Sequence, residues 1–550
     1  MGIATLALLP VLVYFGVFFF TQQNAPFWPW SDEIYLLDVL QRAIDAPDWW
    51  LKIQSLLVRH NEHRILTTRL LAAASYAATG QVHYGFLAFC GNLTLLGVGV
   101  VLYRVFQKCR LPLFYFLPLP FFIFLLSHFD NTFFGLAGPE NFGIVFWAFW
   151  FHWVLATSQP RSTAFFASLM LAFMACFSNG NGLVVLVSGT AILWLQGRFR
   201  DWLWLLGFGC VCAFVYLSNH VFPPHPARFS FWFKLEAGFA FLGSLLNVSP
   251  DERGFHLAAL AGLILSGLSG WTLWQKRKNF PENVQPFLVG SFLLIGLTAF
   301  AWAFSKGEDG PQFAVTSRYK IYSAVFFPLV YLTLLVGWNK RMVQLVGSFL
   351  ALGIFGLSAY FWLPKIADRY DYIQAFEYNV RANVWYKPTS PDFARLSKLY
   401  HTKPMFYEKT IAQLDGKEAL KTTQKTWALD TAFVINNESL RLEESHYQHL
   451  SLRGLAIFFC LKSASNCYLF SAQSRTNPSP VSALKNWEYV QPGFSVEIPF
   501  HSLCSGRYEL VVLEARTEKI EIYPTDYQLN VQEDCTDLQP PKGVVLIEKK

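Results

Sequence analysis

Long apolar runs dominate the first two thirds of the chain and alternate with short polar connections. A helix needs about 20 consecutive apolar residues to cross the hydrocarbon core of a membrane. The pattern therefore predicts an α-helical polytopic membrane protein with about eleven transmembrane helices. The first is residues 2–20, which lack a charged leading region and a small-residue cleavage site and are expected to be an uncleaved span. The others are expected near residues 83–104, 111–127, 141–157, 163–178, 183–197, 202–218, 255–274, 286–304, 320–338 and 343–363.

Basic residues gather in alternate connections between these runs, which predicts the orientation of the chain. The positive-inside rule makes the basic connections cytoplasmic. We therefore expect a protein of the bacterial inner membrane with its N-terminus in the cytoplasm and its C-terminal region in the periplasm. Charged residues are only 15% of the chain, against about 25% in soluble domains. The net charge of +7 follows from these connections and requires no nucleic-acid partner. They contain Arg104, Lys108 and Arg110; Arg161; Arg198 and Arg200; Lys276, Arg277 and Lys278; and Lys340 and Arg341.

The composition changes after residue 363, where polar residues and short β-prone segments replace the apolar runs. We expect a transmembrane domain at 1–363, with interfacial helices at 31–78, and an exported α+β or β-rich periplasmic domain at 364–550. Residues 508–514 are expected to form a strand that follows a turn at Ser505-Gly506. An even number of cysteines in an oxidising compartment indicates two disulfides, with three connectivities open. These cysteines are Cys460, Cys467, Cys504 and Cys535.

Two polar motifs lie between the first and second apolar runs, close to tryptophan pairs. They are Ser31-Asp32-Glu33-Ile34-Tyr35 and His60-Asn61-Glu62-His63-Arg64. Tryptophan favours the headgroup level of a membrane, and a partly desolvated carboxylate there has a raised pKa and is a better base. We interpret the motifs as two sides of a reaction site on the outer face. A solvated interfacial loop, with Asp32 acting only as a helix N-cap, is the alternative.

The expected local structure around these motifs is helical. A helix is predicted to follow Asp32 and to pair Asp38 with Arg42, four residues apart. A second helix, apolar on one face, is predicted from about Trp50 through Arg69 and suits an interface.

The acidic pair followed by Tyr35, on the first outer loop of a many-span protein with an exported C-terminal domain, resembles the GT-C superfamily of glycosyltransferases. That superfamily includes protein O-mannosyltransferases and aminoarabinose transferases. The 60–64 motif is also similar to one in uncharacterised multi-spanning bacterial membrane proteins. The resemblance implies a hexosyl- or pentosyltransferase that uses a polyprenyl-phosphate sugar donor and a cell-envelope glycan or lipid acceptor. It implies an acidic residue of this pair as catalytic base or acceptor-positioning group, and we assign the base to Asp32, with Glu33 second.

Further polar residues on the outer side are candidates for substrate binding. Arg318 can grip a phosphate with a bidentate fork and Lys320 can add charge, while Glu140 is a candidate second acid. We expect Asp32, the 63–64 segment and Arg318 to converge on one cavity. The full predicted set of binding residues is His60, Glu62, His63, Arg64, Arg69, Glu140, Arg318 and Lys320.

No cofactor is required by these motifs, although His60, Glu62 and His63 leave a divalent metal site open; their spacing is not the HExxH pattern. A transporter or flippase of lipid-linked glycans and a non-catalytic envelope-assembly protein are the rival functions. Transporters place ionisable residues near the membrane midplane, whereas these acids and bases lie at the outer ends of the apolar runs. That position favours the transferase.

Overall fold

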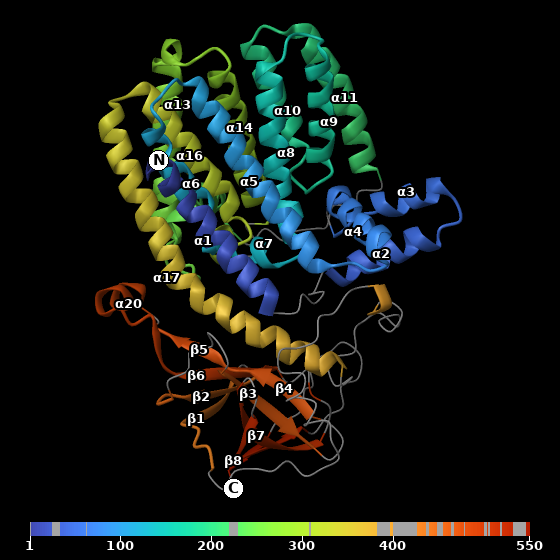
Figure 1. Cartoon of the computed structure of the whole chain (residues 1–550), viewed down its shortest axis with the longest axis vertical. Helices are drawn as coiled ribbons and strands as arrows, with labels where there is room; N and C mark the ends of the chain where they lie inside the picture. Colours follow the sequence, from blue (N-terminus) through green and yellow to red (C-terminus); the bar gives the residue numbers. More distant parts are fainter. Residues whose placement is uncertain are drawn as a thin grey trace. The chain divides into compact units, whose positions relative to one another are not determined.

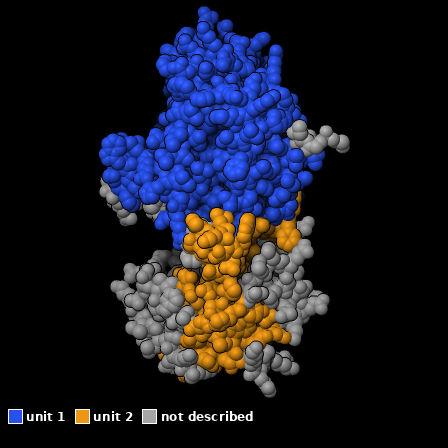
Figure 2. Space-filling view, turned by 90° about the vertical axis from the view of Figure 1, so that its left-hand side faces the viewer, with its two compact units in different colours: residues 1–18, 29–362, 398–401 blue, residues 19–28, 363–397, 402–550 orange. Residues whose placement is uncertain are grey.

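The computed structural model describes residues 2–24, 33–61, 63–218, 229–306, 310–381, 397–399, 426–435, 439–447, 455–463, 467–477, 479–499, 503, 506–516, 520–531 and 546–549. Asp32, Glu62, Cys504 and Cys535 lie outside these ranges. The chain divides into two compact units, coloured separately in Figure 2. The first contains residues 1–18, 29–362 and 398–401, and the second contains residues 19–28, 363–397 and 402–550.

Helices make up the first unit (Figure 1). The helices that lie or begin in it are α1 (Gly2–Asn24), α2 (Glu33–Asp45), α3 (Trp49–Leu57), α4 (Leu66–Thr79), α5 (Tyr84–Lys108), α6 (Pro118–Ile123), α7 (Phe129–Phe133), α8 (Ala137–Thr157), α9 (Thr163–Cys176), α10 (Val184–Leu195), α11 (Phe199–Leu217), α12 (Phe231–Gly243), α13 (Phe255–Gln275), α14 (Val284–Ser305), α15 (Pro311–Ala314), α16 (Lys320–Gly337) and α17 (Lys340–Arg381). Short 3₁₀ turns are η1 (Leu113–Phe116), η2 (Leu126–His128), η3 (Ser244–Leu246) and η4 (Arg277–Asn279).

Eight helical segments of the described chain are long and apolar enough to cross a membrane, which fits the predicted class of polytopic helical protein. They are Thr5–Gln22, Tyr84–Lys108, Leu113–Phe133, Phe199–Leu217, Phe255–Gln275, Val284–Ser305, Lys320–Gly337 and Lys340–Phe376. The number is lower than the eleven expected from sequence. The spans expected at 163–178 and 183–197 are α9 and α10, apolar helices of only 14 and 12 residues. The span expected at 141–157 corresponds to the 21-residue α8, which is not among these eight segments.

Burial separates central from peripheral helices. Nearly every side chain of α8 and α16 is buried, whereas α11 and α17 keep large apolar side chains exposed. Phe214 of α11 is 78% exposed and Phe349 of α17 is 84% exposed. A protein in water rarely exposes so many large apolar side chains in contiguous patches. An apolar outer surface of this kind is consistent with a membrane-embedded bundle.

The helix expected from Trp50 through Arg69 is wrong, because the chain turns between α3 and α4. His60 and His63 pair through their backbones, with N–H···O distances of 2.7 and 2.9 Å. Asn61 between them has φ 52°, a left-handed conformation that an α-helix excludes. The preceding α2 does form as predicted and carries the Asp38–Arg42 ion pair.

The described strands of the second unit form two antiparallel sheets, which confirms that the C-terminal region is β-rich. The sheet orders are β1-β2-β6-β5 and β4-β3-β7-β8-β9. Strand β7 includes the predicted strand at 508–514. The strands are β1 (Thr431–Ile435), β2 (Ser439–Glu444), β3 (Leu455–Lys462), β4 (Cys467–Ser471), β5 (Gln473–Thr476), β6 (Val490–Pro499), β7 (Gly506–Arg516), β8 (Ile520–Val531) and β9 (Leu546–Lys549), with α20 (Pro480–Asn486) and η6 (Ser397–Leu399) as short helices of the chain.

Strand β3 is buried on both faces, which explains its continuous apolar sequence. Ile457 and Phe459 join the core between the two sheets, whereas Phe458 and Cys460 face the C-terminal part of α17. Asn379 of α17 donates to the Leu469 carbonyl and accepts from its N–H, both at 2.7 Å. Cys460 forms a disulfide with Cys467, so one pair among the four predicted cysteines is confirmed.

Candidate functional site

The polar residues singled out in the sequence gather at the end of the helical unit where α8 begins. Glu33, the first residue of α2, is 3% exposed and its Oε1 accepts a hydrogen bond of 2.9 Å from the Leu136 N–H. Leu136 immediately precedes α8, and the positive end of a helix dipole stabilises a carboxylate. Tyr84 donates its hydroxyl to the Glu33 carbonyl at 2.9 Å. Glu33 therefore fixes the start of α2 against the start of α8.

Three asparagine side chains form a hydrogen-bonded row that starts in the connection between α9 and α10. Asn179 donates to Asn141 at 3.1 Å, and Asn141 donates to Asn131 at 3.1 Å. Asn131 in turn donates to the Arg318 carbonyl at 2.7 Å. This asparagine relay joins the 178–182 turn, α8, α7 and the segment before α16.

The 178–182 turn contacts further helices through its other side chains. Asn181 donates to Thr298 of α14 at 3.0 Å and to the Tyr322 hydroxyl of α16 at 2.9 Å. Thr67 of α4 donates to Ser178 at 3.0 Å.

The imidazole of His63 packs directly on Gly180 of the same turn. A Cβ at position 180 would clash with His63 Nδ1, so only glycine fits. Of the predicted outer-face residues, His63 contacts this turn directly, and Arg318 is joined to it through its backbone by the asparagine relay. The predicted convergence with Asp32 on one cavity remains a prediction.

Arg64 contributes to the structure of this region through hydrogen bonds from all three of its side-chain nitrogens. Its Nε donates to the Tyr216 carbonyl at 2.9 Å and its Nη2 to the Ser218 carbonyl at 2.7 Å. Its Nη1 donates to the Leu57 carbonyl. Burial lowers the pKa of Arg64, and the charge of Arg59 lowers it further. Through these bonds Arg64 ties the ends of α3 and α11 to the turn before α4, and its expected contact with substrate remains a prediction.

Arg69 is different, because part of its guanidinium is unused. Arg69 is 1% exposed, and its Nη1 donates to the Leu56 carbonyl at 2.8 Å and to the Val58 carbonyl. Nε and Nη2 have no hydrogen-bond partner among the described residues. Burial lowers the pKa of Arg69 to about 10, the charge of Glu140 raises it and that of Arg64 lowers it, so the side chain stays charged at neutral pH. A buried cation with unpaired donors is rare, so this edge of the guanidinium could bind an anion or a water.

Two buried hydroxyls in the same region also lack partners within the described chain. They are Thr68 Oγ1, next to Arg69 in the sequence, and the Tyr216 hydroxyl. The unpaired nitrogens of Arg69 could bind an anion, and Glu140 is an acidic group that interacts electrostatically with Arg69.

Arg318 and Lys320 lie two residues apart but have opposite environments. Arg318 is exposed, and its guanidinium makes no hydrogen bond or ion pair with the described residues, so it is open to a ligand. Lys320 is 1% exposed; its Nζ donates to the Asn247 carbonyl at 2.5 Å and lies 5.0 Å from the centre of the Trp362 ring. The structure thus corrects the expected substrate contact of Lys320, which holds the start of α16 inside the bundle.

The remaining predicted residues are placed as follows. His60 is 6% exposed and its ring contacts Tyr35, with the ring centres 6.4 Å apart. Asp32 and Glu62 lie outside the described residues, so the catalytic assignment of Asp32 remains a prediction. Within the described chain, no three His, Cys, Asp or Glu side chains are grouped as metal ligands, and a metal that uses Glu62 likewise remains a prediction.

Sequence reasoning missed the amides and hydroxyls that organise this site. Asn179 and Asn181 flank Gly180 between two apolar runs, and Asn141 follows Glu140 directly. Polar amides at the ends of apolar helices are the signal that could have identified them, since a buried amide requires partners. Arg59 and Tyr216 carried no comparable signal.

Comparison of the chain with known protein families, with curated proteins and with solved structures returned no match. The function is therefore inferred from the chemistry of the site.

Proposed function

We propose that this protein is a polytopic inner-membrane glycosyltransferase of the GT-C type. It moves a hexosyl or pentosyl group from a polyprenyl-phosphate donor to a cell-envelope glycan or lipid acceptor at the periplasmic face. The observation that carries the proposal is the unused edge of the buried Arg69 guanidinium.

The unused edge has the geometry that a phosphate needs. Nε–H and Nη2–H of a guanidinium point in parallel and bind two oxygens of one oxyanion. In Arg69 these two nitrogens are the ones without partners among the described residues, while Nη1 is fixed by carbonyls. A phosphate held there would be bound by a preorganised cation, which stabilises the charge that develops as the sugar leaves.

The acidic groups complete the proposed reaction. A base removes the proton of the acceptor hydroxyl, the acceptor oxygen attacks the anomeric carbon, and the lipid phosphate leaves toward Arg69. Asp32 is assigned as the base and precedes Glu33, whose carboxylate is bound by the Leu136 N–H. Glu33 is therefore a positioning residue, and Glu140 is the counter-ion of Arg69. These reaction steps require no cofactor.

The position of the site along α8 supports a membrane-face reaction. Glu33 binds at the start of α8, and the basic connection with Arg161 follows its end. At about 1.5 Å per residue, the 21 residues of α8 span about 31 Å. That length matches a hydrocarbon core about 30 Å thick. The asparagine relay joins the exposed Arg318 to the start of α8, the same end at which Glu33 binds. A lipid phosphate would be found at this end.

The test is sugar transfer by the purified protein in lipid vesicles, using a panel of polyprenyl-phosphate hexoses and pentoses. Asp32→Asn should lower kcat by about 10²–10⁴-fold, as expected for loss of a general base, and leave polyprenyl-phosphate binding unchanged. Arg69→Lys keeps a charge but loses the fork, so it should weaken polyprenyl-phosphate binding. Arg318→Ala should weaken binding without affecting folding, because its side chain is exposed.

Arg42→Gln is the matched control, because it removes a cation from the neighbouring α2. The side chain of Arg42 is 62% exposed. Full activity of Asp32→Asn would refute the base. Unchanged lipid-phosphate binding in both Arg69→Lys and Arg318→Ala would refute the donor site. Movement of the intact donor across the vesicle without sugar transfer would favour a flippase instead.

A further inference from the structure

A second site is indicated at the opposite end of the same helices, in a groove between α9 and α11. The groove has a volume of about 720 Å³ and is lined by apolar side chains with two arginines at one end, Arg161 and Arg200. Phe166 and Trp204, which both line it, are in edge-to-face contact with their ring centres 6.1 Å apart. Gly207 is an exposed lining residue, and a Cβ there would point into open space with no atom within 4 Å.

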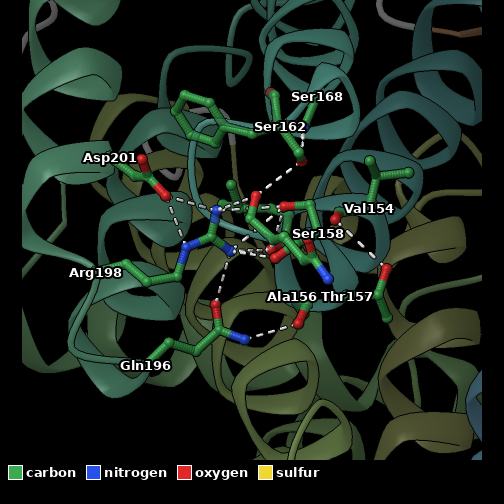
Figure 3. A network of polar contacts seen from close by, with 12 residues as sticks. Val154, Ala156, Thr157, Ser158, Ser162, Ser168, Gln196, Arg198 and Asp201 are labelled. Atoms are coloured by element: carbon green, nitrogen blue, oxygen red, sulfur yellow. Dashed lines mark hydrogen bonds and ion pairs between the residues drawn. The ribbon is translucent and has the colours of Figure 1, made fainter.

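The carboxylate closest in sequence to these arginines is already bound by a third arginine. Arg198 pairs with the buried Asp201 at 2.7 Å and donates to the Leu155 and Ser158 carbonyls at 2.8 and 2.9 Å (Figure 3). Its guanidinium also lies 5.7 Å from the centre of the Phe165 ring. This network joins the end of α8 to the starts of α9 and α11, so it fixes the connections that hold Arg161 and Arg200.

Arg161 and Arg200 themselves are exposed and form no hydrogen bond or ion pair through their side chains with the described residues. Two uncompensated cations therefore stand at the mouth of an apolar groove. The exposed apolar side chains below them include Trp204, 57% exposed, and Val211, 63% exposed. A ligand that fits needs an anionic head and a long apolar tail.

We propose that this groove binds one anionic phospholipid, with its phosphate between Arg161 and Arg200 and an acyl chain along α9 and α11 over Gly207. The inference rests on the membrane placement in the proposed function but not on sugar transfer. The groove is at the end of α8 remote from Arg69, so it is distinct from the donor site. Phosphatidylglycerol is the probe, because it combines a single negative charge with two acyl chains.

The test is native mass spectrometry of delipidated protein in detergent, titrated with phosphatidylglycerol or phosphatidylcholine. The double variant Arg161→Gln/Arg200→Gln should lose about thirty-fold in phosphatidylglycerol affinity, since each arginine near a lipid phosphate contributes about 1 kcal/mol. Arg277→Gln/Lys278→Gln is the control, because it removes the same charge from another exposed basic connection. That control should bind phosphatidylglycerol like the unaltered protein.

A second variant tests the tail without touching the charges. Gly207→Leu places a side chain in the groove and should lower phosphatidylglycerol affinity about tenfold, the effect of losing roughly 1.4 kcal/mol of chain contacts. Equal affinity for both lipids, equal loss in the control pair, or displacement of the lipid by millimolar inorganic phosphate would overturn the proposal. The readout is lipid binding, so its failure is independent of whether any sugar is transferred.

Discussion

Three buried arginines of this protein differ in which of their donors are occupied. Arg198 is neutralised by Asp201, and Arg64 is bound by carbonyls. Arg69 alone of these three keeps an edge of its guanidinium unpaired within the described chain. Burying a cation is costly unless it is paired, and we therefore propose the unpaired edge as the position where a phosphate binds.

Removal of Arg64 is expected to lower the free energy of unfolding by about 2–3 kcal/mol, because carbonyls at two helix ends lose a charged donor. Arg64→Lys should recover little of this loss, since one ammonium cannot reach acceptors that lie on both sides of the guanidinium. Thermal unfolding in detergent measures both variants. A melting temperature of Arg64→Ala equal to that of Arg42→Ala would contradict the structural role.

The pKa of Arg69 predicts how anion binding depends on pH. Burial brings this pKa from its usual 12.5 to about 10, so the folded protein releases this proton at lower pH than the unfolded chain does. The cation is fully present below about pH 9, and binding of polyprenyl phosphate should be lost as the pH rises through about 10. Between about pH 10 and 12.5 the unfolded chain keeps this proton and the folded protein does not, because burial favours the neutral form. The contribution of Arg69 to the free energy of unfolding therefore rises with pH in this range. A binding curve that stays flat to pH 11 would exclude Arg69 from the phosphate site.

At the scale of elements, the break between α3 and α4 creates the site. It allows His63 to pack on Gly180 and Arg64 to reach α11. A continuous helix through these residues would have placed them on one amphipathic face with no contact of this kind.

Substitution of Asn61 tests this turn. Asn61 has φ 52°, which asparagine tolerates and β-branched residues do not. Asn61→Val should lower the free energy of unfolding by about 1–2 kcal/mol, whereas Asn61→Gly should be neutral or slightly stabilising. Chemical denaturation of both variants gives the comparison. Equal destabilisation by valine and glycine would mean that the backbone conformation at 61 is not what matters.

The sequence predicted the elements whose cause is local. Apolar runs of sufficient length predicted α5, α13, α14 and α16, and the acid–base spacing predicted the Asp38–Arg42 pair. It could not predict which arginine donors would be occupied, because Arg64 is bound by carbonyls more than 150 residues away, for example that of Ser218. The buried position of Lys320 depends likewise on Asn247 and Trp362, which only the folded chain brings near.

At the scale of the whole helical unit, two polar networks mark opposite ends of α8. One contains the asparagine relay and Arg69, and the other is centred on Arg198 and Asp201. The short helices α9 and α10 also run between these ends, since the 178–182 turn lies at one and Gln196 binds the Ala156 carbonyl at the other. The length of α8 therefore separates the two polar networks.

This separation predicts the sidedness of labelling. In a cysteine-free background, a membrane-impermeant maleimide applied to intact cells should modify Arg318→Cys and spare Arg161→Cys, both of which are exposed positions. Inverted membrane vesicles should give the reverse result, as the positive-inside rule requires. Modification of both positions from one side would refute the proposed placement of α8 across the membrane.

The hydrogen bonds of the asparagine relay all point in one direction, from the turn at Gly180 to the backbone of Arg318. Every amide in it gives its N–H toward Arg318 and receives at its oxygen from the Gly180 side. Turning over any one amide would set two donors or two acceptors against each other, so the row moves as a unit or not at all. We expect a ligand that shifts the His63 ring against Gly180 to displace this row and, through the Asn131 hydrogen bond, the backbone of Arg318. Binding of a ligand near His63 would then change the position of the exposed Arg318 side chain.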